Sequence, residues 1–413
     1  MGHFPLCCEA RHEAPIRRLI EGCVDFVRRR LPPERLVGVV LTGSFARGEG
    51  SVLSVGGRLK VLGDIEFFVV LARANDYRRL RPEMARWGPM AAAALAEEGV
   101  QADLEFGPVH VGYLYRARPS IFVYDLRHHG KVLWGPPDLL ERMPPITTDG
   151  IPREDALRLL LNRTIEQLDA YDRIATLAAD GVLDVAYQRL KIMLDLAGSA
   201  LAFSGVHCAS YAARPASLAR LLRETPSLAR RLPAHFERDL AQATRVKLAP
   251  DDHDFVRAGG ESADERRPAL RAQITAAVPT MMGLLTWELE QFLGTTGELD
   301  ELLARYLAAQ SLARRAWDWG KLLVNPLPAP RPLSVPAALR LFWTSTPQAL
   351  IYTAGVLAYR DLVASPRSDL VAPPAEAQGN ERLLPLRRAA WPRDRHTRRR
   401  AIVDLWRWCV RNS

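Results

Sequence analysis

Two pairs of acidic residues, each separated by a single apolar residue, are the part of this sequence best suited to chemistry. Asp64 and Glu66 flank Ile65 at the start of DIEFFVVL, an apolar run typical of a buried strand. Side chains alternate along a strand, so both carboxylates fall on one face and Ile65 on the other. Adjacent carboxylates repel each other and are costly to desolvate unless a divalent cation neutralises them. Hard oxygen ligands favour Mg²⁺, so Asp64 and Glu66 are predicted metal ligands.

The second acidic pair lies in VQADLEF, residues 100–106, where apolar and polar residues alternate as in a half-buried strand. Alternation again places Asp103 and Glu105 on one face. One of them can complete a cage of three carboxylates for two metal ions. Asp103 is the favoured third ligand, although spacing alone does not separate it from Glu105.

A glycine-serine turn precedes both pairs in the chain. LVGVVLTGS is typical of a short buried strand ending at Gly43 and Ser44, and FARGEG follows as the start of a short helix. Gly43 lets the backbone approach a phosphate without a Cβ in the way, and the N–H groups that begin a helix favour an anion. The Ser44 hydroxyl can donate to a phosphate oxygen, while Arg47 can bind phosphate in a forked contact or brace the loop.

The order strand, GSFARG, strand with DIE, helix and strand with DLE resembles the DNA polymerase β-type nucleotidyltransferase superfamily over about residues 36–140. Members include aminoglycoside nucleotidyltransferases, minimal nucleotidyltransferases of toxin–antitoxin pairs, and enzymes that add CCA or poly(A) tails. The resemblance implies a mixed sheet with flanking helices, two Mg²⁺ ions, and in-line transfer of a nucleoside monophosphate from an NTP, expected to be ATP, with release of pyrophosphate. It implies catalytic and metal-binding roles for Asp64, Glu66 and Asp103, and nucleotide binding by Gly43, Ser44 and Arg47.

The sequence departs from the family pattern in two places, and it contains one basic residue that could match a further feature of the family. The segment between Ser44 and Asp64 is longer than the family's compact loop, and we expect it to hold a small hairpin over the site. Glu66 stands where aspartate is commoner. In related enzymes a basic residue of the helical domain often reaches the triphosphate, and Lys191 in QRLKIMLDLAG is the candidate here. The alternative is a lysine that snorkels from a helix flank.

The remaining elements predict an α+β domain followed by an all-α region. A helix within residues 1–35 ends at Pro32-Pro33, and the alanine-rich segment before Gly99 is helical. From about residue 152 the apolar spacing is helical. We therefore expect a nucleotidyltransferase domain at 1–150, a helical domain at 151–325 that closes over nucleotide and substrate, and a helical extension at 326–413.

Composition excludes several classes of protein. The chain is 48% hydrophobic and 25% charged, with no apolar run long enough to cross a bilayer and no h-region of a signal peptide. Five scattered cysteines fit free thiols in a reducing cytoplasm. The net charge of +9 comes almost entirely from arginine, which is typical of a GC-rich bacterial genome and does not favour a nucleic-acid partner.

The C-terminal segment is basic and rich in tryptophan, a composition that can stack on bases. The favoured alternative is an amphipathic helix that docks through Ile402, Leu405, Trp406 and Cys409. The sequence thus predicts an Mg²⁺-dependent transferase whose acceptor is the hydroxyl of a small molecule. A transferase acting on protein or RNA, and a catalytically silent module that only binds nucleotide or a partner, are the alternatives.

Overall fold

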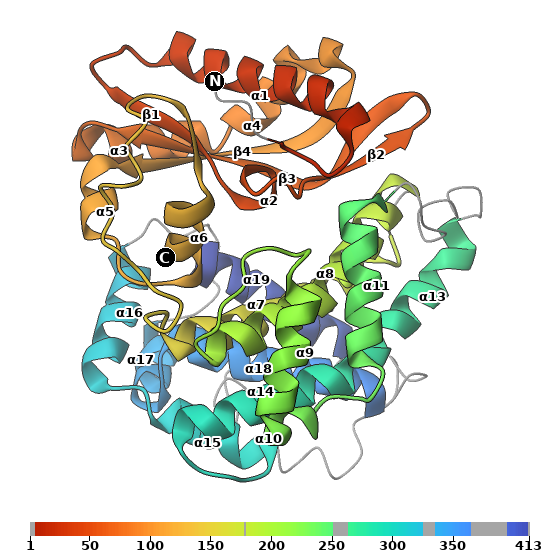
Figure 1. Ribbon diagram of the computed structural model, residues 1–413. Helices are drawn as coiled ribbons and strands as arrows, with labels where there is room; N and C mark the ends of the chain where they lie inside the picture. Colours follow the sequence, from red (N-terminus) through yellow and green to blue (C-terminus); the bar gives the residue numbers. More distant parts are fainter. Residues whose placement is uncertain (1–4, 177–178, 251–262, 325–334, 365–394, 412–413) are drawn as a thin grey trace. The chain divides into compact units, whose positions relative to one another are not determined.

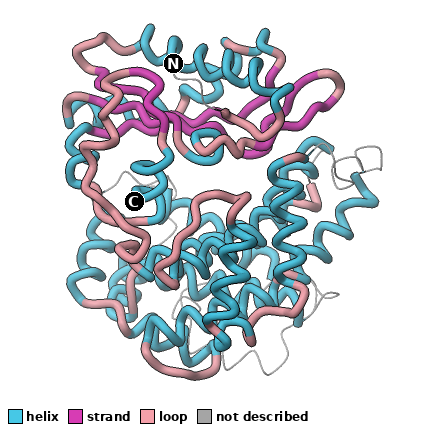
Figure 2. The backbone as a smooth tube through the Cα atoms, in the orientation of Figure 1, coloured by secondary structure: helices cyan, strands magenta, loops and turns pink. Residues whose placement is uncertain are grey.

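The computed structural model describes residues 5–176, 179–250, 263–324, 335–364 and 395–411. The chain divides into two compact units. The first contains Met1–Asp155, Leu201–Leu221 and His235–Glu261, and the second contains Ala156–Ala200, Leu222–Ala234 and Ser262–Ser413. All strands of the described ranges belong to one sheet in the first unit, and the remainder is mostly helical (Figure 2).

These units differ in one respect from the three consecutive domains expected. The boundary expected at residue 150 lies close to Asp155, the last residue of the first segment of the first unit. Two later segments then return to the first unit, which the sequence does not reveal. The boundary expected at residue 325 lies outside the described residues.

The sheet is mixed, as predicted. It contains β1 (Leu36–Leu41), β2 (Ser51–Val55), β3 (Arg58–Leu71), β4 (Val100–His110) and β5 (Lys131–Trp134). The long strand β3 pairs antiparallel with β1 and β2 and parallel with β4, while β5 pairs antiparallel with β1. Strand β3 therefore lies between β1, which ends at the glycine-serine turn, and β4, which carries Asp103 and Glu105.

The expected hairpin is present and extends the sheet. Strands β2 and β3 are joined by Gly56 and Gly57, whose φ angles are +57° and +78°. Two positive φ angles match the twist of a tight hairpin, and glycine adopts them at little steric cost. The register with β4 then shifts between Lys60 and Asp64, and Gly63 has a φ of +94°. This bulge comes directly before the first acidic residue, where it can re-aim the strand.

Helices cover both faces of the sheet. They are α1 (Ala10–Arg30), α2 (Gly43–Ala46), α3 (Ala74–Met84), α4 (Trp87–Ala94), the 3₁₀ turn Ala96–Glu98, α5 (Val111–Arg116) and α6 (Ile121–His129). Helices α1, α3 and α4 pack on one face, and α5 and α6 pack on part of the other (Figure 1). The odd-numbered residues of β3 from Ile65 onward point to the first face, so Asp64 and Glu66 belong to the second.

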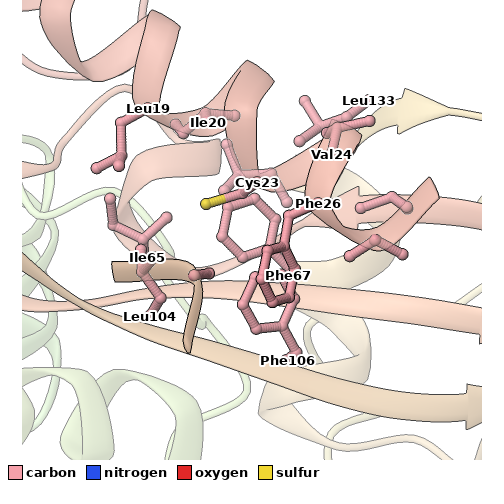
Figure 3. Close-up of a cluster of buried hydrophobic side chains, with 14 of the residues drawn as sticks. Leu19, Ile20, Cys23, Val24, Phe26, Ile65, Phe67, Leu104, Phe106 and Leu133 are labelled. Atoms are coloured by element: carbon pink, nitrogen blue, oxygen red, sulfur yellow. The ribbon is translucent and has the colours of Figure 1, made fainter. Parts of the chain in front are cut away.

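The first face holds an aromatic core beneath α1 (Figure 3). The Phe67 and Phe106 rings stack with centroids 5.1 Å apart, and Phe26 of α1 stacks on Phe106 at 5.8 Å. Offset aromatic stacking adds to the free energy gained by burying the rings. This core fixes β3 against β4 and so fixes the spacing of the acidic residues on the opposite face.

The second unit is a set of packed helices. In chain order the later helices are α7 (Arg153–Arg173), α8 (Ala179–Phe203), α9 (Arg214–Glu224), α10 (Pro226–Ala229), α11 (Phe236–Leu248), α13 (Ala263–Ala276), α14 (Val278–Leu293), α15 (Leu299–Ala308), α16 (Leu312–Val324), α17 (Val335–Thr344), α18 (Pro347–Ala364) and α19 (Arg395–Arg411). Of these, α11 and the first part of α9 belong to the first unit.

The docked form of the C-terminal helix is confirmed. Ile402, Leu405 and Cys409 of α19 are buried, and Trp406 donates to Asn162 Oδ1 at 2.9 Å. Arg399 also pairs with Asp172 at 2.7 Å, where both side chains are buried. The Trp406 and Arg399 side chains therefore bond to residues of the second unit itself, which weakens the case for a nucleic-acid contact.

The cysteines are all free thiols, as predicted. Cys7, Cys23 and Cys409 are buried, and burial is the main reason that the pKa of each is raised to about 12. Among the described helices, none combines the length and the apolar character needed to cross a lipid bilayer.

One glutamate of the second unit is fully buried. Glu288 of α14 is fully buried; its Oε1 lies 2.7 Å from the Ser199 hydroxyl, which is 2.9 Å from the carbonyl oxygen of Ala156. The Ser199 hydroxyl therefore lies within hydrogen-bonding distance of two acceptor oxygens, one of Glu288 and one of Ala156, and can donate to either. Burial raises the pKa of Glu288 to about 8, against the opposing effect of Ser199.

Replacing Glu288 by glutamine is expected to change how stability depends on pH. Between about pH 4.5 and about pH 8 the folded protein holds a proton that the unfolded chain has released, so the free energy of unfolding falls as the pH rises. Glu288→Gln keeps an oxygen that accepts from the Ser199 hydroxyl and carries no proton that titrates. Its stability should exceed that of wild type by a margin that grows across this window to a few kcal/mol, at roughly 1.4 kcal/mol per pKa unit.

Thermal unfolding of wild type and Glu288→Gln across this pH range checks the expectation. The exposed Glu301 provides the matched control, because Glu301→Gln removes a carboxylate from the surface of the same unit. A margin that does not change with pH would contradict a buried neutral carboxyl at position 288.

Candidate metal and nucleotide site

Three carboxylates meet on the second face of the sheet. One oxygen from each of Asp64, Glu66 and Glu105 lies within 4.8 Å of the other two. Asp64 and Glu66 are half-buried, and Glu105 is exposed. We call these three residues the carboxylate triad. They come from adjacent parallel strands whose spacing is held by the aromatic core on the opposite face.

The third member of the triad is Glu105, whereas the sequence favoured Asp103 and left Glu105 as the alternative. The strand register pairs Glu66 with Glu105 and Asp64 with Asp103. Both β4 residues are exposed and share a face, but the group that gathers within metal-binding distance contains Glu105. The register shifts between Lys60 and Asp64, and spacing in the sequence does not reveal this shift.

The glycine-serine turn lies directly beside the triad. The N–H of Thr42 donates to the Glu66 carbonyl at 3.0 Å, and a Cβ placed on Gly43 would lie 3.2 Å from Glu66 Oε2. Gly43 has a φ of +70°, a conformation that side-chain-bearing residues rarely adopt. Ser44 is half-exposed. The structure thus places the Gly43-Ser44 turn beside Glu66 of the carboxylate triad.

The contact between Gly43 and Glu66 allows a controlled substitution. Gly43→Ala should lower stability by about 1–2 kcal/mol through its positive φ, and should also push the Glu66 carboxylate aside and weaken metal binding. Gly56→Ala is the matched control, since Gly56 has a φ of +57° but meets nothing within 4 Å. Thermal unfolding and Mn²⁺ titration of both variants check this. Equal metal affinity in the two variants would show that Gly43 serves the turn alone.

Arg47 braces the loop, which was one of its two expected roles. Its side chain is 8% exposed and lies 3.3 Å from Asp125 and 3.6 Å from Glu49. Its guanidinium also lies over the Tyr211 ring at 5.2 Å. Burial would lower the pKa of Arg47, but Tyr211, Asp125 and Glu49 together raise it, so the side chain stays charged. The forked phosphate contact expected as the other role stays a prediction.

Asp125 holds a histidine as well as Arg47. Its Oδ1 lies 2.8 Å from Nε2 of His207, whose side chain is 3% exposed. Burial would raise the pKa of Asp125, but the hydrogen bond from His207 and the nearby charges of His207, Arg47 and Arg214 lower it. The carboxylate is therefore ionised at neutral pH and anchors two basic side chains beside the turn.

The sequence did not predict these supporting residues, and the role that it predicted for Lys191 stays untested. Glu49, Asp125 and His207 carry no motif in the sequence. Lys191 lies half-buried in α8 of the second unit, so its contact with a triphosphate stays a prediction.

The donor chemistry of the triad fits Mg²⁺. All three groups are carboxylates, the hard ligands that Mg²⁺ prefers, and they approach closely on an otherwise apolar strand pair. The half-buried positions of Asp64 and Glu66 make their mutual repulsion costly unless a cation offsets it. The residues present therefore suit the ions that the resemblance implies.

Comparisons with known proteins add no relative to this picture: no family model, curated protein or solved structure matches the chain. The functional argument therefore depends on the geometry of the site and on the motifs that it contains. These are the carboxylate triad and the adjoining Gly43-Ser44 turn.

Proposed function

We propose that the first unit is an Mg²⁺-dependent nucleotidyltransferase that moves a nucleoside monophosphate from an NTP to a hydroxyl acceptor and releases pyrophosphate. One observation carries the proposal. The carboxylate oxygens of Asp64, Glu66 and Glu105 lie within 4.8 Å of one another, with Gly43 against Glu66. A cation site and a phosphate-binding turn at one point are what a metal-bound triphosphate requires.

The residues of the site take distinct roles in this reaction. Asp64, Glu66 and Glu105 would hold the ions, which when bound neutralise triphosphate charge and lower the pKa of the acceptor hydroxyl. The backbone at Gly43 and the Ser44 hydroxyl would hold a phosphate group and orient it for in-line attack. Positioning and charge neutralisation supply most of the rate in phosphoryl-type transfer, so no covalent intermediate on the protein is needed.

A small-molecule acceptor is favoured over a nucleic-acid end. The best nucleic-acid feature of the sequence was the basic, tryptophan-rich tail. Its Arg399 and Arg407 pair with Asp172 and Asp169, and Trp406 binds Asn162, all within the second unit. Side chains used in this way are not available as a stacking surface. ATP is the expected donor, and the cytoplasm is the expected compartment because all five cysteines are free thiols.

A transfer assay tests the function directly. Each of the four NTPs, labelled at the α-phosphate, is incubated with Mg²⁺ and a panel of hydroxyl-bearing small molecules, RNA and protein substrates. The proposal predicts label on a small-molecule acceptor together with released pyrophosphate, and loss of both in Asp64→Ala/Glu66→Ala. Label on RNA or protein would keep the chemistry and replace the acceptor class.

A catalytically silent module that binds nucleotide is the second candidate. The hairpin inserted between Ser44 and Asp64 and the glutamate at position 66 are the two departures from the family pattern that bear on it. Metal-dependent NTP binding with no turnover on any acceptor would favour this alternative.

A further inference from the structure

The loop that follows the glycine-serine turn is held by residues from far along the chain. The loop is Arg47–Ser51, between α2 and β2. Its partners are Asp125 of α6, the segment His207–Arg214 and Lys247 of α11, all in the first unit. We call these contacts the loop clamp.

Glu49 is the centre of the clamp. Its carboxylate accepts hydrogen bonds from the Ser210 hydroxyl at 2.8 Å and from the backbone N–H groups of Tyr211 and Ala212 at 2.9 and 3.0 Å. Its own N–H donates to the carbonyl of Ser44 at 2.9 Å. One residue therefore ties the segment at 210–212 to the serine of the proposed phosphate-binding turn.

Lys247 closes the clamp from a second direction. Its Nζ donates to the Glu49 carbonyl at 2.9 Å and to Ser51 Oγ at 2.7 Å, and the Ser51 hydroxyl donates to the Lys247 carbonyl at 2.6 Å. Lys247 is 1% exposed and Ser51 is fully buried. A buried ammonium is costly unless its donors are satisfied, so this geometry tightly constrains the loop.

One aromatic ring gathers the cations of the clamp. The Tyr211 ring lies 4.5 Å from the Arg214 guanidinium, 5.1 Å from Lys247 Nζ and 5.2 Å from the Arg47 guanidinium. Cation–π contacts of this kind strengthen when they are removed from solvent. Three cationic side chains therefore lie around the Tyr211 ring. Together with the hydrogen bonds of Glu49, they leave the backbone of the loop little freedom to move.

We propose that Glu49 and Lys247 are positioning residues of the nucleotide site, which fix the Gly43-Ser44 turn against the carboxylate triad. The inference rests on the proposed function, because the turn is the phosphate-binding element in it. A displacement of about 1 Å in such an element can cost about 100-fold in rate. The segments around residues 210 and 247 therefore help to position a site whose binding residues lie between 43 and 105.

Glu49→Gln tests the clamp with little change in size. The amide offers one acceptor oxygen in place of two and turns an N–H group toward the donors at 210–212. We expect the Kd for Mg²⁺·ATP to rise about tenfold or more and amide hydrogen exchange in 42–51 to accelerate. Mn²⁺ affinity without nucleotide should stay within about twofold, because the triad is intact. Ser51→Ala, which removes both hydrogen bonds between the Ser51 hydroxyl and Lys247, should show the same changes more weakly.

Glu98→Gln is the matched control, since Glu98 belongs to the same unit and pairs with Arg18 at 3.0 Å. It should leave nucleotide affinity and exchange in 42–51 unchanged. Folded Glu49→Gln and Ser51→Ala proteins that bind Mg²⁺·ATP as wild type does would overturn the positioning role, even if exchange accelerates. Failure of wild type to bind any NTP would instead defeat the proposed function, so the two failures are told apart by the wild-type titration.

Discussion

Asp64→Asn and Glu66→Gln are each expected to weaken metal binding by at least about 100-fold. Loss of a supporting hydrogen bond to a metal ligand already costs 10–100-fold, and these changes remove a ligand itself. An amide oxygen carries no charge to offset the cation, and the other two carboxylates of the triad cannot replace it. Mn²⁺ binding followed by electron paramagnetic resonance in the absence of nucleotide measures the effect.

The same substitutions should leave the metal-free protein at least as stable as wild type. The triad oxygens lie within 4.8 Å of one another, a distance at which two like charges repel by about 1 kcal/mol even in water. Opposite effects on metal affinity and on stability distinguish a metal site from a structural hydrogen-bond network. The exposed Glu97→Gln is the control. A variant that loses stability and keeps its metal affinity would contradict the assignment of ligands.

Glu105→Gln and Asp103→Asn are expected to differ by more than tenfold in metal affinity. Glu105 belongs to the triad, so its loss should cost about 100-fold, whereas Asp103 should cost no more than about fivefold, the scale of an exposed charge. The two residues make an unusually close comparison, because both are exposed and both lie on the same face of β4.

Titration of both β4 variants with Mn²⁺, and with Mg²⁺·ATP, checks this expectation. Similar large losses in both variants would mean that each carboxylate reaches an ion and that the cage is wider than the triad. A large loss in Asp103→Asn alone would restore the residue that sequence reasoning favoured.

The sequence predicted the positions of β1, the later part of β3 and β4 better than the bounds of the hairpin that precedes Asp64. Apolar runs located β1 and the later part of β3, because burial on both sides of a sheet requires apolar residues throughout. The first part of β3, RLKVLG, carries no such run and becomes a strand by pairing with β2 across Gly56-Gly57. Pairing partners decide the structure of such mixed segments, and a pattern within the segment does not reveal them.

The sequence predicted that the two acidic residues of each strand share one face of the sheet. It did not predict how β3 and β4 align with each other. Alternation placed Asp64 with Glu66 and Asp103 with Glu105, and the structure keeps both pairs on the same face of the sheet. The register pairs Asp64 with Asp103 and Glu66 with Glu105, and the oxygens that gather within 4.8 Å include that of Glu105.

The loop clamp lay beyond sequence reasoning for a different reason. Lys247 and Glu49 are 198 residues apart, and no periodicity links them. Two weak signals were present: Glu49 lies between two glycines in RGEG, and Lys247 is one of only five lysines. Neither signal names a partner, since long-range hydrogen bonds depend on how the chain returns to the first unit.

The most direct test of the central claim is a calorimetric titration of the protein with each of the four NTPs, with and without Mg²⁺. Wild type should bind at least one NTP in the presence of Mg²⁺ and lose that binding when the ion is removed. The double variant Asp64→Ala/Glu66→Ala should fold and bind none. Absence of binding by wild type to all four NTPs, or equal binding by the double variant, would contradict a nucleotide site at the carboxylate triad.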